Sequence, residues 1–536
     1  MKLVTSLQMK ECDRRTIAGE NLPAPTEGLI LMERAGWGIF VALEQHFTHL
    51  AQRPILILCG RGNNGGDGLV LARLLHERGL QPRAWLLADP AALSSDAAVQ
   101  ADRCWALGCP VEVLADAEAV AERLASELRT ATRYPPLVVD ALLGTGSRGA
   151  PRGVIGAAVS MIEHLRAEHE AEILAVDLPT GVNADTGEVE GEAVRAEVTV
   201  TMAYMKVGFV LHPARSYLGR VRVVDIGIPP DVEEDVGLPI SLLTAREASR
   251  LRPARAPQAH KGQVGRVLIT GGSPGLSGAP ALAAEAALRT GSGLVTVAVP
   301  EGLNVALEAK LTEAMTLPCP ETPTGGLSMA AAETVLGRRS TTDVWVIGPG
   351  LGRQADSLAL ARHLVGKAHG PLVVDADGLT ALAEGTSWWR HEEDPPPVLT
   401  PHPGEMARLL GCDRLSANDR PWEIALRYAA EKRCVLVLKG APTFVASPDG
   451  EVTINPTGNA GMATGGSGDA LTGVIASLLG QGLGPAEAAR LGVYLHGHAG
   501  DRALARTGPA GLLPRDLIEA LPDAWRDLDD PSRLRP

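Results

Sequence analysis

The sequence has few aromatic residues, which occupy 3% of its 536 positions, so smaller apolar side chains must fill its cores. It has no excess of basic residues either, because 50 lysines and arginines face 63 aspartates and glutamates, which gives a net charge of −13. No basic stripe with interleaved aromatic residues is present. The phosphate backbone repels an acidic chain of this kind, so we expect no nucleic acid among its partners.

Long apolar runs are also absent, since none approaches the roughly eighteen consecutive apolar residues of a membrane-spanning helix. The first residues, MKLVTSLQMKECDRR, lack the uninterrupted apolar core of a secretory signal. The seven cysteines are odd in number, scattered and form no CxxC pair, so neither a disulfide framework nor a zinc site is implied. These absences predict a cytoplasmic protein in a reducing compartment, without a membrane partner.

Two successive patterns of strand, loop and helix fill the chain. Its length predicts roughly two to four domains, and its hydrophobic fraction of 45% suffices for large cores. The prolines at 229 and 230, the acidic run at 231–235 and a proline- and arginine-rich stretch at 250–258 mark a connector, with a short helix predicted at 242–251. Repeated units of this kind form mainly parallel sheets covered by helices. We predict an α/β fold with two domains, residues 1–235 and residues 236–536.

The first domain is predicted to begin with a helix at residues 27–43 and a buried strand at 54–59. A glycine-rich loop at 60–67 and a helix at 68–79 follow. Gly60, Gly62 and Gly65 in this loop satisfy the GxGxxG pattern, and Asp89 follows the next strand. A nicotinamide-dependent dehydrogenase is therefore an alternative function.

The second half of the same loop argues against a dehydrogenase. Asn63, Asn64 and Asp67 place two carboxamides and a carboxylate where a pyrophosphate needs bare backbone N–H groups. Two further strands end in Asp140 and Asp177. Because ligands of open parallel sheets bind beyond the carboxyl ends of the strands, we expect Asp67, Asp140 and Asp177 to meet in one crevice, although each alone is more often a turn or cap residue.

Four motifs of the first half resemble, in order, those of the NAD(P)H-hydrate epimerase domain, which has a Rossmann-like fold: GRGNNGGDGLVLARLL, VVDALLGTG, AVDLPTGVNADTG and VTVTMAYMKVGFVLHPARSYLGRVRVVDIGIP. The resemblance implies that Asp177 contacts the hydrated dinucleotide and is a catalytic candidate. It also implies a potassium ion held by Asn64, Asp140 and Thr180. The remaining substrate contacts that it implies are Asn63, Asn64, Gly65, Gly66, Asp67, Gly144, Thr145, Gly146, Ser147, Arg148, Gly149 and Ala150. Two positions depart from the pattern: Arg34 replaces the asparagine of MENAG, and Arg61 replaces a proline.

In the second half, residues 455–473 form a glycine-rich stretch that continues into an apolar segment with helical spacing at 470–479. The N-terminal turn of a buried helix has free N–H groups and a positive dipole end, which suit a phosphate. Asp469 lies in this turn, where it could either accept a proton from an attacking hydroxyl or only cap the helix. The stretch lacks the Lys-Ser/Thr ending of a P-loop, which disfavours that class of NTPase.

This half resembles the ADP-dependent NAD(P)H-hydrate dehydratase, a ribokinase-like fold, in HKGQVGRVLITGGSPGLSGAP, GPGLG, VVDADGLTAL, LTPHPGEMARLLG, VLKGAPT and NPTGNAGMATGGSGDALTG. Ala460 departs from it, since a proline is usual there. The resemblance implies that Ala279, Gly350, His402 and Asp469 line the hydrated nicotinamide. It implies nucleotide contacts by Lys439, Gly440, Ala441, Pro442, Thr443 and Gly468. Without the family, a structural histidine would be the default for His402, and a solvated charge would be an alternative for Lys439.

The two resemblances together predict a repair enzyme for NADH and NADPH that have taken up water across the C5–C6 double bond of the nicotinamide ring. The first domain would interconvert the R and S hydrates. The second would use ADP as a co-substrate, with magnesium as a further candidate ion, and Asp469 would be the catalytic base. The resemblance also implies a homo-oligomer. A nucleotide-binding scaffold without catalysis is the non-enzymatic alternative, and it leaves Asp469, Asp177 and Asp140 without a role.

Overall fold

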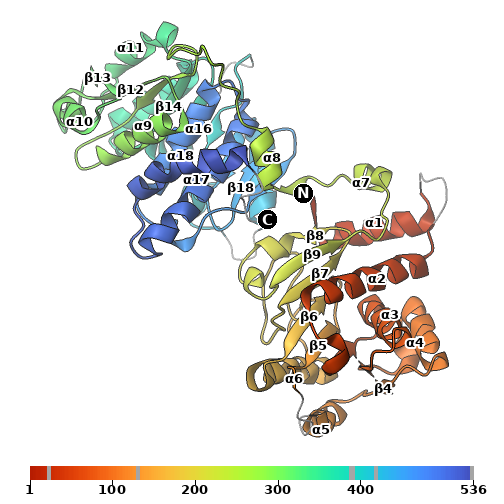
Figure 1. Cartoon of the computed structure of the whole chain (residues 1–536). Coiled ribbons are helices and arrows are strands. Elements are labelled where there is room, and N and C mark those ends of the chain that lie inside the picture. The colour runs from red at the N-terminus through yellow and green to blue at the C-terminus, as the bar shows by residue number, and fades with distance from the viewer. Residues whose placement is uncertain (21–25, 128–132, 386–392, 416–419, 531–536) are drawn as a thin grey trace. The chain divides into compact units, whose positions relative to one another are not determined.

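The computed structural model describes residues 1–20, 26–127, 133–385, 393–415 and 420–530. The chain divides into two compact units, Lys2–Leu238 and Pro239–Pro536, and Met1 is grouped with the second (Figure 1). Within these described ranges, no helix combines the length and apolar character needed to cross a membrane.

The first domain is built on a seven-stranded sheet in which all neighbouring strands run parallel, in the order β4-β3-β2-β5-β6-β7-β9. Counted from β2, this order is the 3-2-1-4-5-6 of doubly wound dinucleotide-binding sheets, extended by one edge strand. The strands are β2 (Ile55–Cys59), β3 (Pro82–Leu86), β4 (Val111–Val113), β5 (Leu137–Ala141), β6 (Glu172–Val176), β7 (Val198–Met202) and β9 (Arg220–Val224).

Helices cover both faces of this sheet, because alternate residues of each strand point to opposite sides. Ile57 of β2 belongs to a core with α2 (Gly28–His46), α3 (Asn63–Glu77) and α4 (Ser95–Ala106). Leu58, the next residue, belongs to a separate core with α6 (Gly153–His169). The two buried faces explain why the strands read as nearly continuous apolar runs.

The amino-terminal segment adds a small second sheet to this domain. Strand β1 (Leu3–Val4) pairs in parallel with β8 (Met205–Lys206), so that Val4 lies opposite Lys206. Helix α1 (Ser6–Ala18) follows directly, and Thr5 begins it with a capping box that includes Gln8. The remaining helices of this domain are α5 (Ala117–Glu127) and α7 (Pro230–Val236).

The second domain contains a ten-stranded sheet in the order β10-β19-β18-β17-β16-β15-β14-β11-β12-β13, parallel except for β18, which runs antiparallel to both of its neighbours. Its strands are β10 (Ile240–Leu242), β11 (Arg266–Thr270), β12 (Leu294–Pro300), β13 (Met315–Cys319), β14 (Val344–Ile347), β15 (Leu372–Val374), β16 (Val398–Leu399), β17 (Val435–Leu438), β18 (Thr443–Ala446) and β19 (Val452–Asn455).

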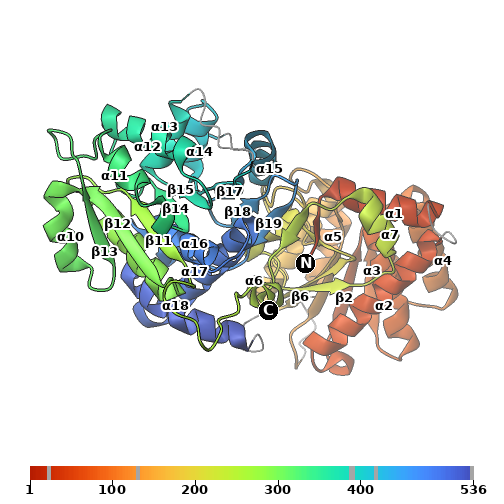
Figure 2. The same cartoon turned by 90° about the horizontal axis from the view of Figure 1, so that it is seen from above.

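One face of this sheet packs against a large core formed with α9 (Gly278–Thr290), α16 (Ser467–Gly480), α17 (Pro485–Thr507) and α18 (Pro514–Asp529). Figure 2 shows α11 (Ala331–Leu336), α12 (Ala355–Lys367), α13 (Asp377–Ala383) and α14 (Pro403–Leu409) on the other side of the sheet. A β-carbon on Gly473 would lie 2.0 Å from the carbonyl oxygen of Ala283, so α16 packs backbone-to-backbone against α9. The other helices are α8 (Ala245–Arg250), α10 (Asn304–Lys310) and α15 (Pro421–Lys432).

The predicted fold class, two α/β domains with mainly parallel sheets covered by helices, is confirmed. Two local predictions were wrong. Helix α3 begins at Asn63, so residues 63–67 form its first turns and not a loop. Glycine is required within this turn because a β-carbon on Gly65 would lie 1.9 Å from the carbonyl oxygen of Gly60, which leaves no room for a larger residue. The helix predicted at 242–251 is confined to α8, because the preceding residues form strand β10 against β19.

Candidate functional site

The first domain contains a cavity of about 530 Å³ beyond the carboxyl ends of its strands. The cavity is lined by residues from α1, α2, α3, the loop after β5, the end of β6 and strand β8. Predicted site residues on its wall are Asn63, Asn64, Asp67, Gly144, Thr145, Gly146, Ser147 and Asp177. Gly65, Gly66, Arg148, Gly149 and Ala150 are not among its lining residues, and Arg148 extends toward Asp185, with the two side chains 3.8 Å apart.

Asp177 stands at the centre of this wall in an unusual backbone conformation, with φ at +64°. Non-glycine residues adopt this region rarely and at a cost, and such residues gather at functional sites. Its Oδ2 accepts a hydrogen bond from the backbone N–H of Thr145, and its Oδ1 accepts one of 3.1 Å from Thr201. The carboxylate is thus fixed between the loop after β5 and strand β7.

Sequence reasoning missed the cation that accompanies Asp177. Lys206 is completely buried and donates hydrogen bonds of 2.5 Å to Asp177 Oδ1, 2.7 Å to Thr201 Oγ1 and 3.3 Å to the carbonyl oxygen of Met202. Its only sequence signal is a charge within the apolar stretch that follows β7. Three more carboxyl groups line the cavity: Asp67, Asp96 of α4 and Asp13 of α1. Burial, followed by the charges of Asp177 and Asp13, raises the pKa of Asp67 well above its usual range.

Asp140 does not lie on the cavity wall, although it was expected in the same crevice. It is completely buried, and its two oxygens accept hydrogen bonds of 2.7 Å from the hydroxyl and backbone N–H groups of Thr180. Burial raises its pKa to about 6, against the effect of these hydrogen bonds. Asn64 lines the cavity, and within the described part of the chain its buried amide has no hydrogen-bond partner for either polar atom.

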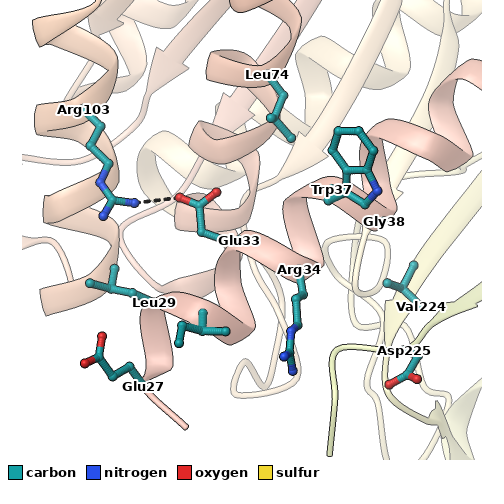
Figure 3. Close-up of a pocket in the computed structure, with 11 residues that line it drawn as sticks. Glu27, Leu29, Glu33, Arg34, Trp37, Gly38, Leu74, Arg103, Val224 and Asp225 are labelled. Atoms are coloured by element: carbon teal, nitrogen blue, oxygen red, sulfur yellow. Dashed lines mark hydrogen bonds and ion pairs between the residues drawn. The ribbon is translucent and has the colours of Figure 1, made fainter.

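The two residues of the first domain that depart from the epimerase motifs, Arg34 and Arg61, lie in different hollows. Arg61 lines the cavity just described. Arg34 lines a different hollow of about 510 Å³ between α2, α3, α4 and β9 (Figure 3). Its guanidinium donates a hydrogen bond to the carbonyl oxygen of Ile226. In the same hollow, Arg103 and Glu33 form an ion pair of 2.7 Å.

The second domain gathers charged residues at the N-terminus of α16. Asp469 is the third residue of this helix, is half-buried, and makes no hydrogen bond with the residues described. The helix start has no side-chain cap, so capping does not explain Asp469. Burial and the nearby charge of Asp375 raise the pKa of Asp469 to about 7, the range that suits a general base.

Lys439 lies beside this helix end. A β-carbon on Gly468 would lie 3.2 Å from its Nζ, so the ammonium group is next to the first turn of α16. Burial disfavours its charge, but the carboxylates of Asp375 and Glu405 outweigh burial and raise its pKa. A buried ammonium group beside free helix N–H groups is suited to a phosphate. Thr443 closes the adjoining loop through a hydrogen bond to the carbonyl oxygen of Gly440, and Ala441 and Pro442 lie between them.

Asp375 was not among the predicted site residues, although it directly follows strand β15 as Asp177 follows β6. Its Oδ1 accepts a 2.9 Å hydrogen bond from Lys439, and its Oδ2 accepts one of 2.7 Å from Thr472 of α16. It is buried, yet Lys439 and Thr472 lower its pKa against the effect of burial. Asp375 therefore links Lys439, which directly follows β17, to helix α16, which contains Asp469.

The predicted nicotinamide contacts lie on neighbouring elements. His402 begins α14, where its Nδ1 accepts hydrogen bonds from the backbone N–H groups of Gly404 and Glu405. His402 therefore caps the start of α14, which is the structural function expected for it. Because Nδ1 accepts these hydrogen bonds, the proton of the neutral imidazole is on Nε2. Gly350 has φ at +63°, and its added β-carbon would lie 3.2 Å from that of Ala279, which brings these two predicted residues together.

The fold and the two sites together define a two-domain α/β protein of the nucleotide-binding class. One domain has a cavity lined by carboxyl groups, and the other has a helix N-terminus suited to binding phosphate. Residues 267–523 match the family model described as NAD(P)H-hydrate dehydratase, and residues 28–208 match the model described as YjeF-related protein N-terminus.

Similar proteins cover nearly the whole chain. The bifunctional NAD(P)H-hydrate repair enzyme Nnr of Moorella thermoacetica is 46% identical over 99% of this chain and 98% of its own length. The protein of the same name from Escherichia coli is 37% identical over 94% and 91%. A solved ADP/ATP-dependent NAD(P)H-hydrate dehydratase from Bacillus subtilis is 32% identical, with 54% of this chain and 98% of that chain covered and a TM-score of 0.47. The chain belongs to the family of bifunctional NAD(P)H-hydrate repair enzymes, and the resemblance drawn from its motifs is confirmed.

Proposed function

We propose that this chain restores hydrated NADH and NADPH in two steps, with one activity in each domain. The first domain interconverts the R and S hydrates, and the second dehydrates the S hydrate with ADP, releasing AMP and phosphate. The observation that carries the second step is the presence of both Asp469 and the ammonium group of Lys439 at the first turn of α16. A scaffold that only binds nucleotides gains nothing from a carboxylate at a phosphate site, because the two charges repel.

In the second domain, hydroxide is a poor leaving group from carbon and must first be converted into a better one. Asp469, whose pKa is raised to about 7, accepts the proton of the substrate hydroxyl. The ammonium group of Lys439 and the N–H groups of α16 hold the diphosphate of ADP and stabilise the phosphoryl group in transfer. Phosphate then leaves with electrons supplied by the ring nitrogen, and loss of a proton from C5 to solvent restores the C5–C6 double bond.

In the first domain, the loop after β5 and the first turns of α3 form the wall against which the hydrated dinucleotide is bound. Thr145 and Asp177 are joined there by a backbone hydrogen bond. The open N–H groups at the start of α3 favour an anionic group of the substrate. The hydrated ring would then lie against Asp177.

A potassium ion fits the residues beneath this wall. Asn64 has a buried amide without a partner among the described residues, and Asp140 and Thr180 supply a buried carboxylate and a hydroxyl. Oxygen ligands of this kind suit a hard cation. No group of three or more His, Cys, Asp or Glu side chains suited to a metal occurs in the described ranges, which is consistent with a site built from amide and hydroxyl oxygens as well. Such an ion would hold Asn64 and the loop after β5 in place.

The test is repair of a mixture of both hydrate epimers, followed by the return of the near-ultraviolet absorbance of the reduced ring. We expect full recovery that requires ADP. Recovery that stops near half conversion would mean that the first domain is not an epimerase. Oxidation of intact NADH by a simple carbonyl compound would instead support a dehydrogenase.

Separate expression of residues 1–238 and 239–536 assigns the activities, because each forms its own compact unit. The first fragment should interconvert the epimers without ADP, and the second should dehydrate only one of them. An activity that needs both fragments would contradict one site per domain. The cytoplasmic location, the homo-oligomeric state and a magnesium requirement stay predictions of the sequence and its resemblance.

A further inference from the structure

The cavity of the first domain contains two carboxyl groups in opposite electrostatic surroundings. Asp177 is in contact with the buried ammonium group of Lys206, whose three protons are all used in hydrogen bonds. Asp177 therefore has a cationic partner within hydrogen-bond distance. Asp13 extends from α1 into the same cavity and is half-buried there. It makes no hydrogen bond with any residue that the structure describes.

Burial raises the pKa of Asp13 to about 7, and the charge of Asp177 adds to this effect while Lys206 opposes it. At neutral pH a large fraction of Asp13 therefore carries a proton. Two carboxyl groups in one cavity, one neutral and one charged, are the usual arrangement of a general acid and a general base. The hydrogen-bond network places the ammonium group of Lys206 on Asp177 and leaves Asp13 without a hydrogen-bonded cation.

The position of Asp13 is fixed by contacts with the same part of the domain that carries Lys206. Strand β1 pairs with β8, with Val4 opposite Lys206. At the start of α1, the backbone N–H and the hydroxyl of Ser6 both donate to Asp185 Oδ1, at 2.6 and 3.0 Å. These contacts hold the helix against the domain, so Asp13 is part of a built wall and not of a loose terminus.

We propose that Asp13 and Asp177 are the two proton-transferring groups of the epimerase, with Asp13 as the acid and Asp177 as the base in one direction. This inference rests on the proposed epimerase function. Asp13 donates its proton to the hydroxyl on C6 of the hydrated ring, the C6–O bond breaks, and water leaves. The lone pair of the ring nitrogen forms a C=N bond to C6, which makes C6 planar.

A water molecule then adds to the opposite face of C6. Its oxygen forms the new C–O bond, the electrons of the C=N bond return to nitrogen, and its extra proton passes to Asp177. The product is the other epimer, and the pair now stands with Asp13 charged and Asp177 protonated. That form catalyses the reverse conversion with the two functions exchanged, so no oxidant or other co-reactant is needed.

The first test compares Asp13→Asn with the unaltered full-length chain on mixed epimers and excess ADP. The unaltered chain should recover the reduced cofactor in a fast phase from the S hydrate and a second phase from the R hydrate. In Asp13→Asn the second phase should fall about 10²–10⁴-fold, which is the usual effect of losing a positioned acid–base group, while the fast phase is retained. Rates without enzyme are subtracted.

Glu11→Gln is the matched control, because Glu11 belongs to the same helix but pairs with Arg14 and Arg15. It should keep both phases. If the unaltered chain lacks the second phase, the proposed epimerase function fails. If it has that phase and Asp13→Asn retains it, only the assignment of Asp13 fails.

The second test uses water enriched in oxygen-18 and omits ADP, so that the hydrates are not consumed. The step proposed here replaces the C6 oxygen with one from solvent water. The unaltered chain should label the hydrates at the rate at which it interconverts the epimers, and Asp13→Asn should lose both together. Interconversion without label would overturn C–O cleavage and with it the two-carboxyl mechanism.

Discussion

The ammonium group of Lys439 donates a hydrogen bond of 2.9 Å to Oδ1 of Asp375, a carboxylate that is 1% exposed. Removal of one member of a buried ion pair leaves the other charge without compensation. Asp375→Ala should therefore lower the free energy of unfolding of the second domain by about 3–5 kcal/mol, as measured by denaturant titration. Affinity for ADP should fall as well, because Lys439 loses its position.

Glu451→Ala is the control for this change, because the exposed Glu451 side chain forms a single-contact ion pair with Arg490 in the same domain. Exposed pairs contribute about 0–1 kcal/mol, so this variant should unfold nearly as the unaltered protein does. Equal losses in the two variants would contradict the structural importance given to Asp375.

Asp469→Asn should reduce dehydration about 10²–10⁴-fold, because the amide keeps the size of the side chain but cannot accept the proton. Binding of ADP should be retained or tightened, since a negative charge near the phosphates is removed. The measurement is steady-state dehydration of the S hydrate, together with calorimetric binding of ADP. Near-normal turnover with an intact fold would exclude a catalytic function of Asp469.

The dehydratase should also depend on pH through Asp469. Its pKa of about 7 means that below this pH the carboxyl group is protonated and cannot act as a base, whereas above it the base is present. kcat/KM should therefore rise with pH up to about 7 and then level off. A flat profile between about pH 5 and 8 would contradict the assignment of Asp469 as the base.

Potassium should activate the first domain, and Asp140→Asn should weaken that response, because it removes the one charged ligand of the proposed site. The measurement is interconversion of the hydrate epimers across a potassium titration, with sodium used to keep the ionic strength constant. A titration unchanged in Asp140→Asn would remove Asp140 from the ion site, and a chain indifferent to potassium would remove the site itself.

Gly350→Ala should inactivate the dehydratase and destabilise its domain. Gly350 has a positive φ, and an added β-carbon would lie 2.4 Å from the carbonyl oxygen of Leu276. Gly366→Ala is the control, since no atom outside its own turn of α12 lies within 4 Å of its added β-carbon. That change should stabilise the domain by roughly 0.5–1 kcal/mol. Thermal unfolding and dehydration rates of both variants provide the comparison.

Much of the architecture could be predicted from the sequence, because each buried parallel strand is a short apolar run followed by a polar loop. Asp177 follows such a strand, and its position at the cavity was predicted from that pattern alone. Asp140 lies within β5, one residue before its end, and does not line the cavity, since the direction of a strand side chain depends on its packing. The start of α3 at Asn63 was missed because glycines usually indicate loops.

Lys206 and Asp13 could not be found in the same way. A lysine in an apolar stretch indicates burial but not its partner, and its contact with Asp177 depends on how β8 is placed beside β7. Asp13 is one acid among several in a charged terminal helix. The pairing of β1 with β8 and the contact of Ser6 with Asp185 bring it to the cavity, and a pairing of two-residue strands leaves no periodic signal in the sequence.

The pairing of β1 with β8 also sets an order of events during synthesis. Val4 leaves the ribosome about two hundred residues before Lys206, which lies opposite it. Domains fold as units while the chain is made, and contacts distant in sequence close last. Strands β2–β7 can therefore assemble as a sheet before the amino-terminal helix docks, and the cavity gains its last wall only when the domain is almost complete.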